Sequence, residues 1–183
     1  VRCEFWDAAS ELERVDVEPL DEVTIRLHAA GVGPGRVEGL EAMRQRVVEA
    51  CRGMDGLKLT ENFLWREWDE VVDAWQLDDW PAYRDVKWLG RKTWLSEQQR
   101  QAAWSVFERV KQSMKQDGVT TMSRVLGRVS DLVALGRNLP YDFVVVDEAQ
   151  DVGVPQLRLL AAMQQHGKAS SETLFFAGDL GQR

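Results

Sequence analysis

Apolar residues recur every three or four positions along most of the first 135 residues, which is the spacing of helices that bury one face. In one such stripe Leu64 is followed by Trp68 and Trp75, and both tryptophans are expected in a core. A weaker alternation over 23–27 indicates extended chain. The stripes predict helices over 38–52, 64–75, 83–89, 96–117 and 121–135.

The longest predicted helix carries signals at both ends. Ser96 and Gln99 have the spacing of a capping box, in which each side chain bonds the backbone N–H of the other residue. Gly118 follows the last turn, where glycine commonly ends a helix. The helix is therefore expected to begin just after Ser96 and to end at 117–118.

The pattern changes after residue 140. An apolar run over 142–146 predicts a strand covered on both faces, and a second strand is predicted over 173–177. A helix with Pro155 near its start lies between them. The residues of this helix expected to face inward are Leu157, Leu160 and Ala161. A strand, a helix and a strand at this spacing form a βαβ unit with a parallel sheet, so the predicted fold class is α/β.

Two adjacent carboxylates follow the first of these strands. Asp147 and Glu148 stand at its carboxyl end, where open α/β sheets bind their ligands. An Asp there can hold Mg²⁺, and a neighbouring Glu can polarise an attacking water. Asp179 and Gln182 follow the second strand and are expected at the same edge, where a Gln can bond a terminal phosphate. The pattern favours nucleotide hydrolysis, and the alternatives are an acidic loop and an ordinary turn.

Positive charge and tryptophan gather in the middle of the chain. The formal net charge is −7, yet residues 83–140 carry 11 basic and 5 acidic side chains. Within this basic middle segment, Trp88 and Trp94 flank Arg91 and Lys92. Cations that neutralise phosphates and rings that stack on bases make this stretch a candidate nucleic-acid contact. The alternatives are an unevenly charged surface and tryptophans that serve core packing.

The chain has no run of about 18 apolar residues and no signal-peptide pattern, so we expect no membrane-spanning helix and a cytoplasmic location. Cys3 and Cys51 lack the spacing of metal ligands and are expected to be reduced thiols. His28 and His166 are far apart in the sequence and are expected to be ordinary surface groups. The start at Val1 rather than Met indicates processing or a fragment of a longer protein.

Two strings resemble motifs of a known enzyme family. Residues 144–151, Val-Val-Val-Asp-Glu-Ala-Gln-Asp, resemble motif II (Walker B) of the UvrD/Rep-like DNA helicases of superfamily 1. Residues 178–183, Gly-Asp-Leu-Gly-Gln-Arg, resemble their motif III, and the spacing between the two strings also fits. Upstream, residues 63–68 and 83–95 resemble the helical insertion of bacterial members, called subdomain 1B. The resemblance covers residues 63–183.

The resemblance implies a partial RecA-like P-loop NTPase fold, α/β in class, with parallel strands and a mainly helical inserted subdomain. Residues 1–60 would belong to the first RecA-like domain or its connection, and 61–118 to the helical insertion. Residues 119–183 would be the part of the RecA-like domain that holds motifs II and III. Such an enzyme uses ATP and Mg²⁺ to move along single-stranded DNA.

The resemblance also implies roles for single residues. Asp147 would coordinate Mg²⁺, and Glu148 would be the catalytic base that activates water. Gln182 would sense the γ-phosphate of ATP, and Asp179 belongs to the same nucleotide site. Gln150 would lie at that site and couple it to the DNA-binding elements.

The family's phosphate-binding motif is not found. The 183 residues contain no Gly-Lys-Thr/Ser string, and Gly-Arg-Lys-Thr at 90–93 has no predicted strand before it. The Walker A segment and the second RecA-like domain, with its arginine fingers, would be partners supplied by the rest of a helicase. Without their charges the isolated chain is expected to be inactive. The alternative is a non-catalytic nucleic-acid- or protein-binding module derived from a helicase, while an unrelated Mg²⁺-dependent hydrolase is disfavoured because no further acids or histidines cluster.

Overall fold

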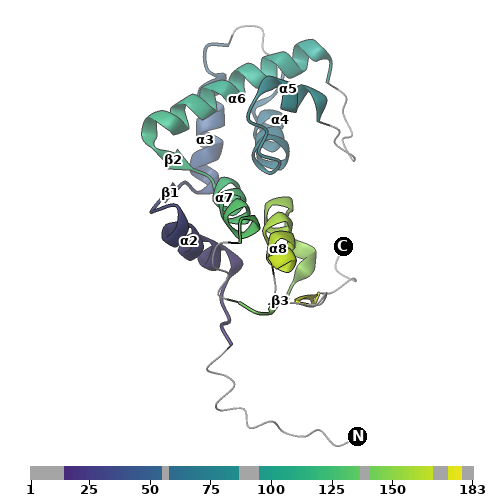
Figure 1. Ribbon diagram of the computed structural model, residues 1–183. Helices are drawn as coiled ribbons and strands as arrows, with labels where there is room; N and C mark the ends of the chain where they lie inside the picture. The colour runs from purple at the N-terminus through teal and green to yellow at the C-terminus, as the bar shows by residue number, and fades with distance from the viewer. Residues whose placement is uncertain (1–14, 55–57, 87–94, 137–140, 167–172, 179–183) are drawn as a thin grey trace, which may run out of the picture.

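The computed structural model describes residues 15–54, 58–86, 95–136, 141–166 and 173–178 (Figure 1). Most of these residues are helical, and two pairs of short parallel strands complete the fold. No helix within these ranges is long and apolar enough to cross a bilayer. The buried apolar side chains form two separate cores, each enclosed by different helices.

The first core belongs to a group of helices that we call the helical unit. It is enclosed by α3 (Leu40–Cys51), α4 (Glu61–Glu67), α5 (Trp80–Asp85) and α6 (Glu97–Asp117). α4 continues directly into a π-helical turn, η2 (Trp68–Asp73). Aromatic rings fill the centre of this core, with ring centroids 5.5 to 6.5 Å apart. The rings that meet there are those of Trp68, Tyr83, Trp104 and Phe107.

The second core lies between α7 (Met122–Ala134) and α8 (Val154–His166), and α2 (Leu20–Gly31) packs against α7 (Figure 1). We call this group the α7–α8 unit. β3 (Val144–Val146) pairs in parallel with β4 (Leu174–Phe176), and the pair packs against this core through one face. The strand–helix–strand unit and its parallel sheet are therefore confirmed. The larger RecA-like architecture stays a proposal.

Two short strands join the units. β1 (Arg36–Val37) pairs in parallel with β2 (Val119–Thr120), and the next residue, Glu38, donates its N–H to the Thr120 carbonyl at 2.9 Å. Beside them, the mostly buried carboxylate of Glu38 accepts hydrogen bonds from Arg46 of α3. The pairing fixes the end of α6 against the chain that enters α3.

The predicted helices over 38–52, 96–117 and 121–135 are confirmed as α3, α6 and α7. The capping box is present, because the Ser96 hydroxyl accepts the Gln99 N–H at 3.2 Å and Gln99 Oε1 accepts the Ser96 N–H at 2.9 Å. At the other end of α6, Gly118 adopts the left-handed conformation with φ of 64°. Both ends of α6 are therefore set by local sequence.

Replacing Gly118 with alanine is expected to lower the free energy of unfolding by roughly 1 kcal/mol, because a Cβ is disfavoured at positive φ. Open space surrounds this position, so no clash adds to the cost. Gly118→Asn should lose less, since asparagine tolerates this conformation better than alanine does. Urea unfolding of the three proteins measures the order, and equal losses for Ala and Asn would contradict it.

Two expectations for the first third of the chain are wrong. Residues 23–27, expected to be extended, lie inside α2, where the Thr24 hydroxyl donates to the Leu20 carbonyl at 2.7 Å. A short alternation of apolar and polar residues does not outweigh packing against α7. His28, expected on the surface, is buried, and its Nε2 has no hydrogen-bond partner among the described residues.

The region after η2 also differs from expectation. Trp75 was expected in the core but is 37% exposed, because the chain leaves the helix just after η2. The helix expected over 83–89 begins earlier, at Trp80, where the Asp79 carboxylate accepts the Ala82 N–H at 2.8 Å. The end of that predicted helix lies outside the described residues.

Two expectations about the βαβ unit are wrong. β3 was expected to be covered on both faces, but Phe143 and Val145 are 71% and 72% exposed, because nothing in the described chain packs on that face. In α8, Leu157 and Ala161 face outward, while Leu160 is buried as expected. The buried face is rotated about the helix axis, and its other members are Leu159, Ala162 and Met163.

Candidate nucleotide site at the end of β3

The chain turns sharply where β3 ends. Asp147 and Glu148 are both exposed there, and Glu148 adopts the left-handed conformation with φ of 51° and ψ of 42°. The Asp147 Oδ1 accepts the backbone N–H of Glu148 at 2.9 Å, which stabilises the turn. A non-glycine residue in this conformation is uncommon, and such strain gathers at functional sites. At such a turn two successive side chains need not point to opposite faces, as they do along a strand.

A short 3-10 turn, η3 (Ala149–Asp151), follows and contacts the Glu148 side chain. The Asp151 N–H donates to the Glu148 carbonyl at 2.9 Å. The Gln150 side-chain amide donates to Glu148 Oε2 in a short hydrogen bond. The predicted base is therefore oriented by a neutral donor, which holds the carboxylate in place without adding a charge.

The end of β4 meets this turn, as expected from the sequence. The Ala149 N–H donates to the Ala177 carbonyl at 2.9 Å, and the Ala177 N–H donates to the Val146 carbonyl at 2.7 Å. A Cβ added to Gly178 would lie 2.5 Å from Gln150 Oε1 and 3.1 Å from the backbone nitrogen of Ala149, so a larger residue there would require the Gln150 side chain to move and would press on the turn. Asp179 and Gln182 lie outside the described residues, and so their roles stay predictions.

The carboxylate oxygens at this turn could supply only some of the ligands that a Mg²⁺ ion needs. Carboxylate oxygens are ligands that Mg²⁺ accepts, and one oxygen of Asp147 is taken by the Glu148 N–H. The described residues contain no group of three or more His, Cys, Asp or Glu side chains that could hold a metal by themselves. A Mg²⁺ ion here would depend on water and substrate phosphates for its other ligands, as is usual for this ion.

The basic middle segment uses several of its cations internally. Arg109 donates to the Ala50 carbonyl at 2.7 Å, and Lys111 donates to the Leu77 carbonyl at 2.5 Å. Burial lowers the pKa of Lys111 to about 8. These two cations therefore bond backbone carbonyls of the helical unit, although the sequence alone would count them among the candidates for a phosphate backbone. The four candidate DNA contacts, Arg91, Lys92, Trp88 and Trp94, lie outside the described residues.

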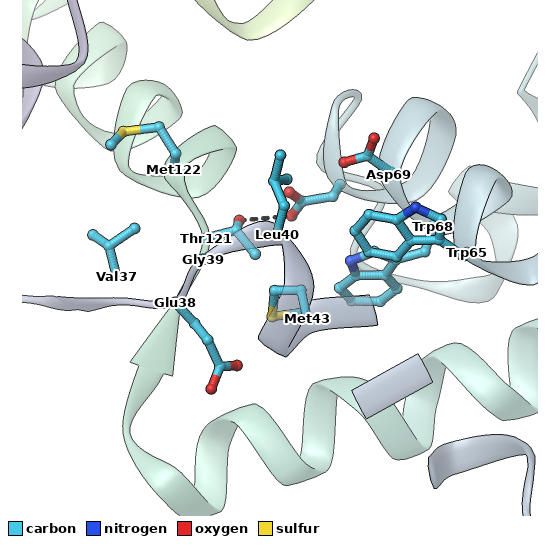
Figure 2. A pocket seen from close by; sticks show the side chains of 11 residues that line it. Val37, Glu38, Gly39, Leu40, Met43, Trp65, Trp68, Asp69, Thr121 and Met122 are labelled. Atoms are coloured by element: carbon cyan, nitrogen blue, oxygen red, sulfur yellow. Dashed lines mark hydrogen bonds between the residues drawn. The ribbon is translucent and has the colours of Figure 1, made fainter. Parts of the chain in front are cut away.

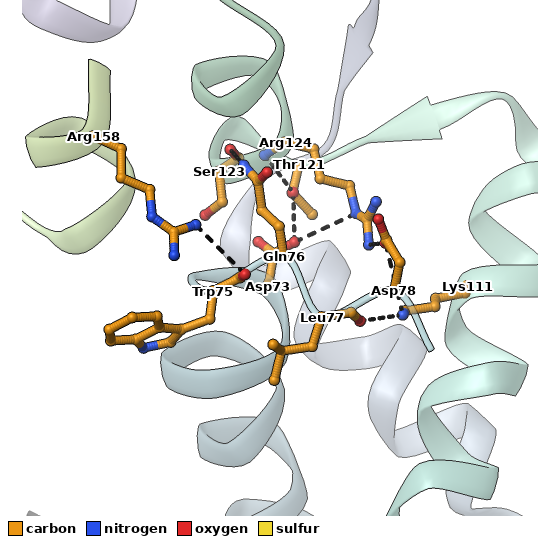
Figure 3. A network of polar contacts seen from close by, with 10 residues as sticks. All are labelled: Asp73, Trp75, Gln76, Leu77, Asp78, Lys111, Thr121, Ser123, Arg124 and Arg158. Atoms are coloured by element: carbon orange, nitrogen blue, oxygen red, sulfur yellow. Dashed lines mark hydrogen bonds and ion pairs between the residues drawn. The ribbon is translucent and has the colours of Figure 1, made fainter. Parts of the chain in front are cut away.

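A polar joint between η2 and α7 was not found by sequence reasoning (Figure 3). Asp73 is buried at the end of η2, and it accepts the Thr121 hydroxyl at 2.8 Å. The Nε of Arg124 lies 3.8 Å from the same carboxylate, and Nη2 of Arg124 donates to exposed Asp78 at 2.7 Å. Burial raises the pKa of Asp73, while the Thr121 hydrogen bond and the Arg124 charge act against this rise.

Two further contacts complete the joint. Gln76, at φ of 55°, donates its side-chain amide to the Ser123 carbonyl at 2.8 Å and packs on Gly127, where a Cβ would lie 1.9 Å from the amide nitrogen. The guanidinium of Arg158 lies over the Trp75 ring, 5.2 Å from its centroid. Arg158 is on α8, the helix that follows the turn at Asp147 and Glu148, which we call the acidic turn. This helix therefore also contacts the helical unit.

No known protein family, curated protein or solved structure matches this chain. The geometry of the strand end and the motifs themselves are therefore the observations that bear on function.

Proposed function

We propose that this chain is the central part of an ATP-dependent DNA helicase or translocase that couples ATP hydrolysis to movement on single-stranded DNA. The observation that carries the proposal is the pair of adjacent carboxylates, Asp147 and Glu148, at the carboxyl end of a parallel strand. That edge is where open α/β sheets bind ligands. The Ala177 carbonyl at the end of β4, directly before the motif III string, accepts the Ala149 N–H and so supports a position of that string near the same turn.

In this proposal each residue of the turn has a separate role in ATP hydrolysis. Mg²⁺ neutralises charge on the phosphates, and Asp147 is the side chain that would hold it. Glu148 would accept the proton of the attacking water, with its carboxylate oriented by the Gln150 amide. Gln182 and Asp179 would contact the nucleotide from the adjoining strand end. The water oxygen would bond to the γ-phosphorus as the bond from that phosphorus to the β–γ bridging oxygen breaks, which releases ADP and phosphate.

The exposed apolar face of the β3–β4 sheet is evidence that this sheet belongs to a larger domain. Val145 and Phe175 are register partners, and they are 72% and 68% exposed. Parallel sheets are almost always covered on both faces, and two strands alone are marginally stable. In this proposal the remainder of a helicase supplies the residues that pack on the exposed face of the sheet. It also supplies the Walker A segment and the second RecA-like domain.

The missing phosphate loop favours a second candidate. With no Gly-Lys-Thr/Ser string in its 183 residues, the chain also fits a non-catalytic nucleic-acid- or protein-binding module derived from a helicase. The reading frame upstream of Val1 separates the two. A Gly-Lys-Thr/Ser loop after an apolar strand supports the enzyme, whereas a complete upstream frame without one supports the binding module.

We expect the isolated chain to show no ATP turnover above that of its Glu148→Gln variant, with or without single-stranded DNA. The physical reason is that the acids alone do not stabilise the charge that develops on the transferred phosphoryl group. A steady-state ATPase assay measures this. Robust turnover that Glu148→Gln abolishes would show that the chain contains a complete site, contrary to the proposal.

A further inference from the structure

A cavity of about 240 Å³ lies between the start of α3, the helix formed by α4 and η2, and the start of α7 (Figure 2). Its walls are mainly apolar and include Leu40, Met43, Trp65, Trp68 and Met122. Trp68 also belongs to the aromatic core, where its ring packs against that of Phe107. The volume is below the roughly 300–1,000 Å³ usual for pockets of drug-sized ligands, so it admits only a fragment-sized molecule and excludes a nucleoside triphosphate.

Two of the carboxylates that line this cavity already have partners. Asp73 accepts the Thr121 hydroxyl and lies beside the Arg124 guanidinium in the polar joint. Glu38 is paired with Arg46. These two charges are therefore compensated by the protein itself.

The third carboxylate, Asp69, is different. Its side chain makes no hydrogen bond or ion pair with any residue that the structure describes, and it is only partly exposed. Burial, and then the charge of Glu70, raise the pKa of Asp69. Asp69 follows Trp68 directly and stands four residues after Trp65, and all three residues line the cavity (Figure 2). Asp69 also lies in the π-helical turn, a local irregularity that is frequent at functional sites.

We propose that this cavity binds a small organic cation with a flat apolar body, with its charged group at Asp69 and its body against Trp65 and Met43. An uncompensated carboxylate next to aromatic rings selects a cation, because the ring faces attract positive charge. The thioether of Met43 adapts to the shape of an apolar group. The bound molecule would touch the helical unit and the first residue of α7 at once. The site is separate from the acidic turn, and it does not depend on the proposed function.

Benzamidine and benzamide test the charge preference, because the two molecules have nearly the same shape and only benzamidine is a cation. Titration of the full chain is followed by the indole N–H signals in two-dimensional NMR and by tryptophan fluorescence. Benzamidine is expected to shift the signals of Trp65 and Trp68 saturably, with a Kd at least about tenfold lower than that of benzamide. Equal binding of the two compounds, or no shift up to about 10 mM benzamidine, overturns the proposal.

A pair of neighbouring variants tests the assignment to Asp69. Asp69→Asn removes the unpartnered carboxylate and should weaken benzamidine binding about tenfold or more, while benzamide binding is unchanged. Glu70→Gln makes the same change of net charge at an exposed position one residue away and should leave both affinities unchanged. An equal effect of the two substitutions would mean that only the overall charge matters, and the site would be rejected. If Asp69→Asn is unfolded by circular dichroism, the comparison of the two compounds on the unaltered chain decides.

Discussion

Replacing Phe107 with alanine is expected to lower the free energy of unfolding by about 3–5 kcal/mol, the usual cost of removing a large aromatic side chain from a well-packed core. Phe107 is fully buried on α6. Its ring lies 5.8 Å from that of Trp68 and 5.6 Å from that of Tyr83, measured between centroids. Three helices of the helical unit meet at this ring, so a cavity there weakens all of their contacts at once.

Gln112 provides the control for this substitution, because it is exposed on the same helix. Gln112→Ala should change stability by no more than about 0.5 kcal/mol. Urea unfolding followed by tryptophan fluorescence reports mainly on the helical unit, where Trp68 and Trp104 lie in the core. A loss of less than about 1 kcal/mol for Phe107→Ala would mean that the four rings do not form the centre of a packed core.

The described residues form two cores, so a fluorescence signal from one core does not by itself report the unfolding of the other. The helical unit and the α7–α8 unit share no buried core residue, and they meet through β1, β2 and the polar joint. Cooperative unfolding of the whole chain therefore depends on this junction, since a single transition requires coupled units. Far-ultraviolet circular dichroism, which also reports on α7 and α8, should be recorded beside fluorescence.

The parts of the fold that local sequence determines were predictable. In α6 the capping box at Ser96 indicates the start, Gly118 indicates the end, and a regular apolar stripe runs between them. α7 is similar, with Thr121 as its N-cap. Where propensity, periodicity and capping agree, the sequence is sufficient to place the helix.

Other features depend on tertiary contacts and were not predictable. The helix ends just after the π-helical turn of η2, so a stripe of 3.6 residues per turn that was continued to Trp75 placed this partly exposed side chain in the core. The face of α8 that is buried depends on α7, which no pattern within α8 reveals. A carboxylate next to Val72 on an apolar stripe needs a buried donor, but nothing in the sequence indicates that Thr121 is that donor for Asp73.

The candidate site, like the fold, has features that the sequence predicts and features that depend on tertiary contacts. The position of Asp147 and Glu148 at a strand end follows from the apolar run before them and from the rule for parallel sheets. The left-handed conformation of Glu148 and its hydrogen bond from Gln150 depend on the turn that packs against Ala177 and Gly178. The sequence therefore predicted where the two carboxylates stand in the fold, while their orientation required the structure.

Removing the cation of the polar joint is expected to have the second largest effect on stability. Arg124→Leu leaves the Asp73 carboxylate buried without a positive charge beside it, which should cost about 2–3 kcal/mol near neutral pH. The other carboxylate that Arg124 contacts, Asp78, is exposed, and its loss in Asp78→Ala should cost less than about 1 kcal/mol. Urea unfolding of the two variants measures the difference.

The dependence on pH identifies Asp73 as the cause. Burial raises the pKa of Asp73 in the folded protein, and loss of the Arg124 charge raises it further. A raised folded pKa gives stability that is present at low pH and lost as pH rises through that pKa, because the folded state binds the proton more tightly than the unfolded state does. The cost of Arg124→Leu should therefore be larger at about pH 8 than at about pH 5. In a protein that also carries Asp73→Asn, Arg124→Leu should lower the free energy of unfolding by less, and by the same amount at both pH values. An equally large loss in that protein would mean that Arg124 stabilises the joint through a residue other than Asp73.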